Sequence, residues 1–422
     1  MLFLGKRMQM SDTLFFAKLG HNRELSKLEL SILMEILEIQ RKSTFFEFKN
    51  FLFFTLPKEL EKEFFSLINK TGSIVKVGKA VLIGKKKDSL FKIKKNFEAK
   101  LEQIIEQRYK EIKPPMKIAL NVHCNLNELE DYSSFTKTII RKIANEHRLS
   151  INLRRAKKIS FELAPAQYYR EKFSKKGVEI SVFKIKSKIY IGKTIWVTNP
   201  NKDILLDESR PVRFFTHGTS IKVARSMVFL SKVKERDLLI DPFCGTGTIL
   251  IIGLLRNCQV IGIDIDRNCI NAAKENIEVL RKKGHVNTDS HWELYNADVK
   301  ELSKLLKKKA DAIVTEPYLG PFLKRLPTYE KGKDIMKELE RLYKQAFEEF
   351  EKAIKKGGRV VFVIPEYNYR KKGIIAPDIN KIIGDTSFKL QTRSSYFNVS
   401  LPIKIGRKHN VISRRLLITE KL

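Results

Sequence analysis

Cysteine is scarce in this sequence, and the few cysteines present do not form a recognisable framework. The four residues are Cys124, Cys244, Cys258 and Cys269. None forms a CxxC pair, and no cluster of histidines and cysteines has the spacing of a zinc site. The pattern excludes a disulfide-stapled secreted fold and predicts buried free thiols in a reducing compartment, with no bound metal.

Long apolar segments are also missing. The longest apolar runs, such as 249–255, are far too short to span a bilayer. The N-terminus lacks a small-residue cleavage site after a long apolar core, so we expect no signal peptide. No stretch has the pattern of a basic amphipathic membrane anchor. We therefore expect a cytoplasmic protein without membrane association.

Acidic residues are too few to balance the basic ones. The formal net charge is +34, with 82 lysines and arginines against 48 acids. Roughly +19 of this charge precedes residue 200 and roughly +15 follows it, so no single tail carries the excess. Such a surface attracts polyanions and releases their counterions on binding. Charge alone does not distinguish a nucleic-acid-binding protein from an ordinary protein of a lysine-rich proteome.

The chain is too long for one ordinary domain, and its pattern changes near residue 200. With 422 residues and 43% hydrophobic content, two or three domains with real cores are expected. Residues 10–200 alternate between predicted strands and helices. One helix is predicted to begin at Ser26, with Glu29 at capping-box spacing. The run 199–201, Asn-Pro-Asn, is typical of a linker. We predict three domains, an α/β domain at 1–84 and two further domains at 85–198 and 199–422.

Aromatic residues lie among basic ones in the second of these segments. Tyr168, Tyr169 and Phe173 are followed by Lys175 and Lys176, and further basic runs occupy 85–87 and 154–158. Charge runs are usually solvated faces, but interleaved aromatic rings favour contact with RNA bases.

The second half alternates strands and helices. Predicted strands at 238–240, 260–263, 291–295, 310–314 and 359–364 are separated by predicted helices. This alternation predicts a parallel, doubly wound sheet with right-handed crossovers, completed by strands near 388–393 and 411–419.

A glycine-bearing turn follows the first of these strands. It reads Asp241-Pro-Phe-Cys-Gly-Thr-Gly-Thr248 and leads into an apolar helix. Gly245 and Gly247 let the backbone turn tightly and approach a ligand, and a helix start favours an anionic group. The chain lacks GxGxxG and GxxxxGK[ST], which disfavours a nicotinamide dehydrogenase and a P-loop ATPase. The anionic group would then be the carboxylate of a methionine moiety.

Acidic residues end three successive strands. Asp241 ends the first, Asp264 ends the second, and Asp298 follows the third. An aspartate in this position is often only a helix cap. Three together suit S-adenosyl-L-methionine (SAM), because ligands bind at the carboxyl ends of parallel strands. Asp264 would accept hydrogen bonds from the ribose hydroxyls, and Asp298 would accept one from the adenine amine.

The fourth strand is followed by Thr315-Glu-Pro-Tyr-Leu-Gly-Pro321. An exocyclic amine of a base is a poor nucleophile, so acceptors on its N–H groups assist its attack. Glu316 can supply one acceptor, and the carbonyl of Glu316 or Pro317 the other, while Tyr318 can stack on the base. Positioning would supply most of the rate, and a base inside a stem must first be extruded. The alternative interpretation is an ordinary strand-to-helix turn.

Three segments together carry a family resemblance. Residues 210–228 (RPVRFFTHGTSIKVARSMV), 241–250 (DPFCGTGTIL) and 262–266 (GIDID) resemble the THUMP-containing RNA methyltransferases. The greatest similarity is to the archaeal and eukaryotic tRNA (guanine-10-N2)-methyltransferases. Residues 19–30 (LGHNRELSKLEL) resemble the N-terminal signature of that family.

The resemblance implies a fold and roles for individual residues. It implies a C-terminal Rossmann-like class I SAM methyltransferase domain with a seven-stranded, mostly parallel sheet, preceded by ferredoxin-like and THUMP domains that grip a tRNA. The implied catalytic set is Thr315, Glu316, Pro317 and Tyr318. The implied SAM-binding set is Thr216, Asp241, Pro242, Phe243, Gly245, Gly247, Asp264, Ile265, Ala297 and Asp298. The sequence leaves open whether a small activator subunit accompanies the chain, which is otherwise expected to be a monomer.

One departure from the family pattern keeps alternatives open. The family's catalytic tetrapeptide is Asp-Pro-Pro-Tyr, whereas this chain has Thr315-Glu-Pro-Tyr318. The carboxylate is one position late and one methylene longer. The first hypothesis is methylation of guanine N2 in tRNA or another structured RNA. The second is methylation of adenine N6 in RNA or DNA, and the third is a non-catalytic RNA-binding protein that retains SAM.

Overall fold

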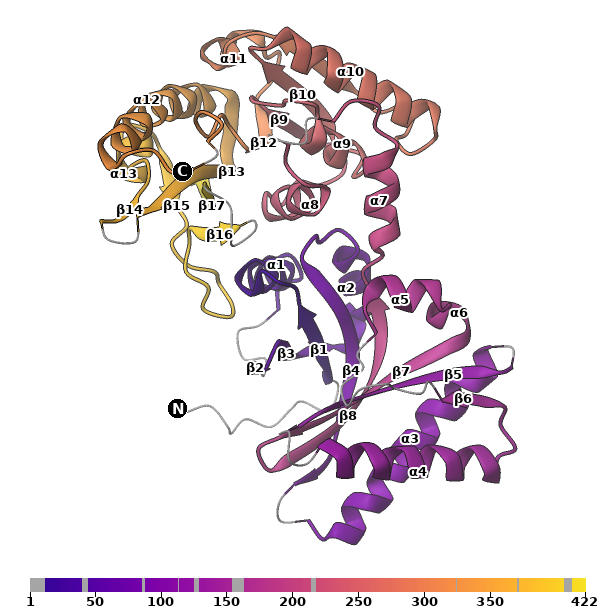
Figure 1. Cartoon of the computed structure of the whole chain (residues 1–422). Coiled ribbons are helices and arrows are strands. Elements are labelled where there is room, and N and C mark those ends of the chain that lie inside the picture. The colour runs from indigo at the N-terminus through magenta and orange to yellow at the C-terminus, as the bar shows by residue number, and fades with distance from the viewer. Residues whose placement is uncertain are drawn as a thin grey trace. The chain divides into compact units, whose positions relative to one another are not determined.

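The computed structural model describes two compact units of the chain (Figure 1). It describes residues 12–39, 45–85, 88–112, 114–124, 129–153, 163–213, 218–323, 325–369, 372–405 and 412–422. Unit 1 comprises residues up to Gly20, Ile39–Ser66 and Ile74–Lys202. Unit 2 comprises His21–Glu38, Leu67–Ser73 and Asp203–Leu422. Unit 2 therefore takes two short segments from the N-terminal part of the sequence.

Unit 1 is built on one continuous eight-stranded sheet of order β2-β3-β1-β4-β8-β7-β5-β6. The pairs from β2 to β7 are antiparallel, whereas β5 pairs in parallel with both β7 and β6. The expected boundary at residue 84 falls at the end of β4, inside this sheet. The strands are β1 (Asp12–Leu19), β2 (Phe45–Phe48), β3 (Phe51–Pro57), β4 (Ile74–Lys85), β5 (Met116–His123), β6 (Ile151–Leu153), β7 (Gly177–Ile185) and β8 (Lys188–Val197).

Two long helices and an aromatic cluster bury the faces of this sheet. Helices α3 (Leu90–Glu111) and α4 (Leu129–Glu146) contact one another and pack on β5, β7 and β8 (Figure 1). Elsewhere Phe16, Phe53 and Phe183 bury their rings together. The shorter helices are η1 (Lys58–Leu60), α2 (Glu61–Ile68), α5 (Pro165–Arg170) and α6 (Phe173–Lys176).

The aromatic residues expected to interleave with basic ones are part of the core instead. Tyr168 is 9% exposed and Phe173 is 1% exposed, and both pack with Leu163 and Val197. Tyr169 donates a hydrogen bond to the Val197 carbonyl. The spacing of these aromatic residues therefore reflects packing of two short helices, and the buried rings of Tyr168 and Phe173 do not offer faces for base stacking. The basic runs 86–87 and 154–158 lie outside the described residues.

Unit 2 contains the predicted seven-stranded sheet, in the order β11-β10-β9-β12-β13-β17-β15. The first four neighbouring pairs are parallel, and β17 is antiparallel to β13 and β15. The order reverses between β9 and β12, which places a crevice at their carboxyl ends. The strands are β9 (Leu238–Asp241), β10 (Gln259–Asp264), β11 (Trp292–Asn296), β12 (Ala310–Thr315), β13 (Ile354–Tyr369), β15 (Phe388–Leu390) and β17 (Ser413–Lys421), with β14 (Gly373–Ile375) on β13 and β16 (Ile403–Ile405) on β17.

Helices connect these strands and cover the sheet. The longest, α12 (Tyr329–Ala353), buries Tyr343, Phe347 and Phe350 against Phe362 of β13. The predicted Rossmann-like fold is thereby confirmed. The remaining helices are α8 (Ile221–Leu230), α9 (Thr248–Leu254), α10 (Arg267–Lys282), η3 (Val299–Glu301), α11 (Leu302–Leu305) and α13 (Ile379–Ile383). Within the described part of the chain, no helix combines the length and apolarity needed to cross a membrane.

In the connecting segments, the predicted start of one helix was wrong, and the expected linker runs into another helix. Helix α1 (Arg23–Ile36) begins earlier than expected, because Asn22 caps it by accepting a hydrogen bond from the Leu25 N–H. Ser26 is buried inside the helix and donates to backbone carbonyls of Asn22 and Ser73. The expected linker at 199–201 leads directly into helix α7 (Pro200–Glu208), where proline suits the first helical turn.

A buried carboxylate fixes α1 within unit 2. Glu29 is fully buried and accepts hydrogen bonds from the N–H groups of Gly72 (2.7 Å) and Ser73 (3.0 Å), and from the Ser73 hydroxyl. The same loop approaches α8 closely, because a side chain at Gly72 would collide with the Lys222 carbonyl. The glycine and the glutamate thus let an N-terminal helix pack beside α8.

The substitution Glu29→Ala should destabilise unit 2 by about 2–5 kcal/mol, because it leaves buried backbone N–H groups without acceptors. Urea unfolding followed by Trp292 fluorescence in a Trp196→Phe background reports on this unit, since Trp292 lies in β11. The control Glu24→Ala, at a half-exposed glutamate of the same helix, should cost less than about 1 kcal/mol. Equal losses in the two variants would contradict the role given to Glu29.

Candidate active site

A buried hydrogen bond joins the ends of the two strands at the crevice. The Thr315 hydroxyl at the end of β12 donates to Asp241 Oδ1 at the end of β9, over 2.6 Å. Both residues are almost completely buried. Burial raises the pKa of Asp241 to about 7, and the negative charges of Asp264 and Glu316 add to the rise, while donors from Thr315 and the Phe243 N–H oppose it. The three carboxylates therefore interact electrostatically around one crevice.

The glycine-bearing turn leaves open space beside this carboxylate. Gly245 and Gly247 both have positive φ angles, 50° and 82°, which favour glycine. A Cβ at Gly245 would meet no atom within 4 Å, whereas one at Gly247 would lie 3.1 Å from the Ala273 Cβ. Gly247 is therefore needed for packing against α10, and Gly245 leaves room at the turn. Pro242 is buried and Phe243 packs partly against the core.

Asp264 lies next to the same turn. Its Oδ2 accepts a hydrogen bond from the Gly245 N–H at 2.8 Å, and its Oδ1 accepts one from the Asp266 N–H at 3.0 Å. Burial raises its pKa, and these two donors oppose the rise. A carboxylate has about four acceptor positions. Asp264 therefore retains capacity for hydroxyl donors of a ligand.

The residues after β11 lie beside those after β10. The Ala297 N–H donates to the Asp264 carbonyl, and the Asn296 amide donates to the carbonyls of Asp264 and Ile265. Ile265 is 73% exposed, which is unusual for isoleucine and offers an apolar surface to a flat ring. Asp298 is partly exposed and caps η3 through the Lys300 N–H. It therefore also performs the helix-capping role that the sequence left as an alternative.

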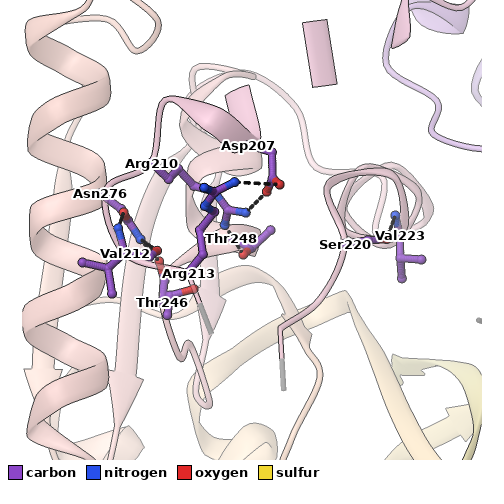
Figure 2. Close-up of polar contacts among 9 residues, drawn as sticks. All are labelled: Asp207, Arg210, Val212, Arg213, Ser220, Val223, Thr246, Thr248 and Asn276. Atoms are coloured by element: carbon purple, nitrogen blue, oxygen red, sulfur yellow. Dashed lines mark hydrogen bonds and ion pairs between the residues drawn. The ribbon is translucent and has the colours of Figure 1, made fainter. Parts of the chain in front are cut away.

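A segment before α8 is anchored to the turn by a polar network, shown in Figure 2. Arg210 is buried, and its guanidinium donates to the Thr248 hydroxyl at 2.7 Å and pairs with Asp207. Asn276 of α10 binds the Val212 backbone and the Thr246 carbonyl. The network holds the segment from Arg210 to Val212 against the glycine-bearing turn. Thr216, expected near the methionine end of SAM, lies outside the described residues.

Glu316 follows Thr315, and its carboxylate contacts a cation from the last strand. Its Oε1 lies 2.9 Å from Arg414 Nε of β17, and its Oε2 accepts a hydrogen bond of 2.5 Å from the Thr219 hydroxyl. The side chain is 6% exposed. Burial raises the pKa of Glu316, while the positive charge of Arg414 and the Thr219 hydroxyl oppose the rise. The carboxylate is therefore positioned from both sides yet retains free acceptor positions.

The two residues after Glu316 form a shelf. Pro317 is buried, whereas the Tyr318 side chain is 55% exposed. The backbone carbonyl of Tyr318 accepts a hydrogen bond of 2.6 Å from the hydroxyl of buried Tyr343 on α12. This bond fixes the shelf to the core while leaving the tyrosine ring available for a planar ligand.

The structure thus brings together Asp241, Asp264 and Glu316 at the carboxyl ends of the strands, but several residues that contact them had no sequence signal. Arg414 and Thr219 contact Glu316 from positions far away in the chain. Nothing in their local sequence indicates that role. Arg210 lies in one of the segments that carry the family resemblance, but its hydrogen bond to Thr248 could not be predicted from the sequence.

Two family models match the chain. Residues 210–382 match an RMKL-like methyltransferase domain, and residues 53–275 match a model described as a DNA methylase. The first match contains the glycine turn, Asp264 and the Glu316 shelf, whereas Asp207 and Arg414 lie outside it.

Individual relatives are tRNA-modifying proteins. The chain is 29% identical over 219 residues to a tRNA (guanine(10)-N2)-dimethyltransferase of Methanothermobacter thermautotrophicus, covering 51% of this chain and 54% of that relative. It is 33% identical over 142 residues to a "Probable tRNA (guanine(10)-N2)-dimethyltransferase" of Methanothermococcus thermolithotrophicus, covering 33% and 78%. Among solved structures, TrmN from Thermus thermophilus is similar, with 13% identity, coverage of 97% and 100%, and a TM-score of 0.47. The chain thus spans about half the length of the first relative.

The raised pKa of Asp241 predicts a stability that falls as the pH rises. In the unfolded chain this carboxyl has its ordinary pKa of 3.8, and in the folded protein its pKa is about 7. Between these values the folded state binds more protons, so the free energy of unfolding decreases with increasing pH and levels off above about pH 7. Asp241→Asn removes this titration. As the pH rises from 5 to 8, the free energy of unfolding of the variant should therefore increase by about 2–3 kcal/mol relative to that of wild type.

Urea unfolding of the cofactor-free protein, followed by Trp292 fluorescence at several pH values, measures this difference. The exposed Asp289 provides a control, and Asp289→Asn should parallel wild type. If the stability of Asp241→Asn also ran parallel to that of wild type, the pKa of Asp241 would not be raised in the folded protein.

Proposed function

Because this chain belongs to the same methyltransferase family as the archaeal tRNA (guanine(10)-N2)-dimethyltransferases, we propose that it is a SAM-dependent tRNA methyltransferase acting on guanine N2. The observation that carries the proposal is that Asp241 is bonded to Thr315, directly before the Glu316-Pro317-Tyr318 shelf, and interacts electrostatically with Asp264, which binds the glycine turn. The cofactor and the base amine would thus meet at the ends of neighbouring strands.

The residues present fit SAM. Gly245 leaves open space at the turn, Asp264 can accept from the ribose hydroxyls, and exposed Ile265 can cover the adenine ring. Asp298 and the backbone near Ala297 are the partners proposed for the adenine amine. When bound, SAM supplies a methyl group on a positively charged sulfur. We also propose that Thr216 approaches the methionine end of SAM, as the family resemblance implies.

Glu316 is the proposed proton acceptor. Its free acceptor positions can bind one amine N–H, while Tyr318 stacks on the base and Pro317 fixes the backbone. Once the nitrogen carries the methyl group, its proton passes to a Glu316 oxygen and then to water. Burial raises the pKa of Glu316, which makes the carboxylate a better proton acceptor than an exposed one. Fully buried Thr315 acts through Asp241 and is a positioning residue.

Unit 1 is the proposed tRNA-binding part, with residues 85–198 as a THUMP-like module. Lys172, Lys175 and Lys176 are exposed there, and the chain carries a net charge of +34. Charge of this kind binds phosphates without reading sequence. A tRNA substrate would place the protein in the cytoplasm.

A second candidate is methylation of adenine N6, favoured by the match of residues 53–275 to a DNA methylase model. The same acceptors and shelf could serve that amine. The deciding experiment incubates the purified chain with SAM and an unmodified tRNA transcript, followed by mass spectrometry of the nucleosides. We expect N2-methylated guanosine. N6-methyladenosine would support the second candidate, and SAM binding without transfer to any RNA would support a non-catalytic role.

The variant Glu316→Gln should reduce single-turnover methyl transfer at least about 100-fold, because an amide cannot accept the proton. SAM affinity, measured by calorimetry, should stay within about twofold of wild type. Undiminished transfer would exclude Glu316 as the acceptor.

Arg414→Ala tests positioning of that acceptor. Arg414 lowers the pKa of Glu316, so its removal should move the ascending limb of the kcat–pH profile to higher pH. The control Arg393→Ala, at an exposed arginine of the same unit, should leave the profile in place. A lower rate at every pH without displacement would indicate a structural role only.

A further inference from the structure

An aromatic corner lies on the carboxyl side of the sheet in unit 2, the same side as Glu316. Thr315 pairs with Phe362 of β13, and β13 continues seven residues further, to Tyr369. The Tyr369 hydroxyl donates to the carbonyls of Pro327 and Thr328, directly before Tyr329 opens α12. The rings of Tyr329 and Tyr369 meet edge to face at 5.2 Å. The end of the strand and the start of the helix are thereby held together.

The backbone of α12 is adapted to this corner. Gly332 lies in the first turn of the helix, and a Cβ there would lie 2.4 Å from the Tyr369 hydroxyl. The corner therefore depends on a glycine inside a helix, where glycine costs about 1 kcal/mol relative to alanine. A rigid arrangement of these rings is retained in spite of that cost.

Two lysines converge on the Tyr329 ring. Lys333 Nζ lies 4.6 Å and Lys372 Nζ 4.9 Å from its centroid, and both side chains are exposed. Both ammonium groups thus lie within about 6 Å of the ring centroid, which is the reach of a cation–π interaction. The carboxylate of Glu330, 3.6 Å from Lys333, is 75% exposed and contributes little. The ring therefore orders two exposed cations, each of which can contact a phosphate of a polyanion.

Two exposed aromatic rings lie on the segment of the chain between the shelf and this corner. Phe322 is 60% exposed and Tyr318 is 55% exposed. The intervening Gly320 packs toward Ile335 of α12 and the Tyr367 hydroxyl of β13. The segment that bears the two rings therefore lies against the same helix and strand that form the corner. Exposed rings near cations are what single-stranded nucleic acid requires for stacking.

We propose that the surface formed by Phe322, Tyr329, Lys333 and Lys372, here called the Tyr329 surface, binds the unpaired RNA strand that flanks the extruded target nucleotide. Tyr329 orders the two ammonium groups that contact phosphate, and Phe322 stacks on a neighbouring base. The inference rests on the proposed function, because it takes Tyr318 as the shelf for the target base. The proposal adds an RNA-binding surface on unit 2 to the one proposed on unit 1.

The test measures binding of a fluorescent tRNA transcript to the full chain by anisotropy, at several salt concentrations. Lys333→Gln with Lys372→Gln should weaken binding about tenfold and reduce the salt slope by about 1.4–1.8, since two phosphate contacts are lost. Phe322→Ala should weaken binding about fivefold or more without changing the slope. In turnover, KM should rise while kcat is unchanged.

The matched control is Lys309→Gln with Lys356→Gln. These two exposed lysines lie at the amino ends of β12 and β13, and the double change alters the net charge by the same amount. SAM affinity of every variant reports on folding. The proposal is overturned if the Lys333/Lys372 variant loses no more affinity than this control. Wild-type protein that binds the transcript yet methylates no nucleoside would refute the proposed function while leaving the surface intact.

Discussion

The buried hydrogen bond from Thr315 to Asp241 is the contact on which the site depends. It joins the two strands between which the sheet order reverses, and it holds a carboxylate where burial alone would disfavour its charge. The glycine turn leaves β9 directly after Asp241, and the Glu316 shelf leaves β12 directly after Thr315. A change in the separation of these strand ends would move the cofactor side and the base side of the crevice relative to one another.

The same bond accounts for the departure from Asp-Pro-Pro-Tyr. Thr315 occupies the position of the family's acid. Its hydroxyl is hydrogen-bonded to Asp241, and its side chain is buried in the core. The next residue then supplies the carboxylate, and the extra methylene of Glu316 lets it reach between Thr219 and Arg414. Arg414 provides the countercharge that makes a second acidic group in a buried crevice tolerable, because a lone buried carboxylate would be neutralised. The displaced acid is thus paired with a residue from the last strand, Arg414.

Sequence periodicity predicted the catalytic fold well because its strands are buried on both faces and read as continuous apolar runs. The positions of Asp241, Asp264 and Glu316 followed from the rule that parallel strands end at one edge. Long-range partners were beyond reach: no local pattern links Arg414 to Glu316, or Glu29 to Gly72. Ser26 was mistaken for a cap because Asn22, four residues earlier, is an equally good one. Tyr168 and Phe173 were placed at an RNA surface because composition does not report which side of a short helix is buried.

Charge balance gives the strongest physical reason for a cationic cofactor. Asp241, Asp264 and Glu316 all have raised pKa values, and at Asp241 the other two acids contribute to the rise. Arg414 is engaged by Glu316. A ligand that brings an ammonium group and a sulfonium would stabilise the ionised carboxylates, whereas a pyrophosphate would be repelled by them. The charges of these three acids therefore favour a cationic nucleoside cofactor over one that carries a pyrophosphate.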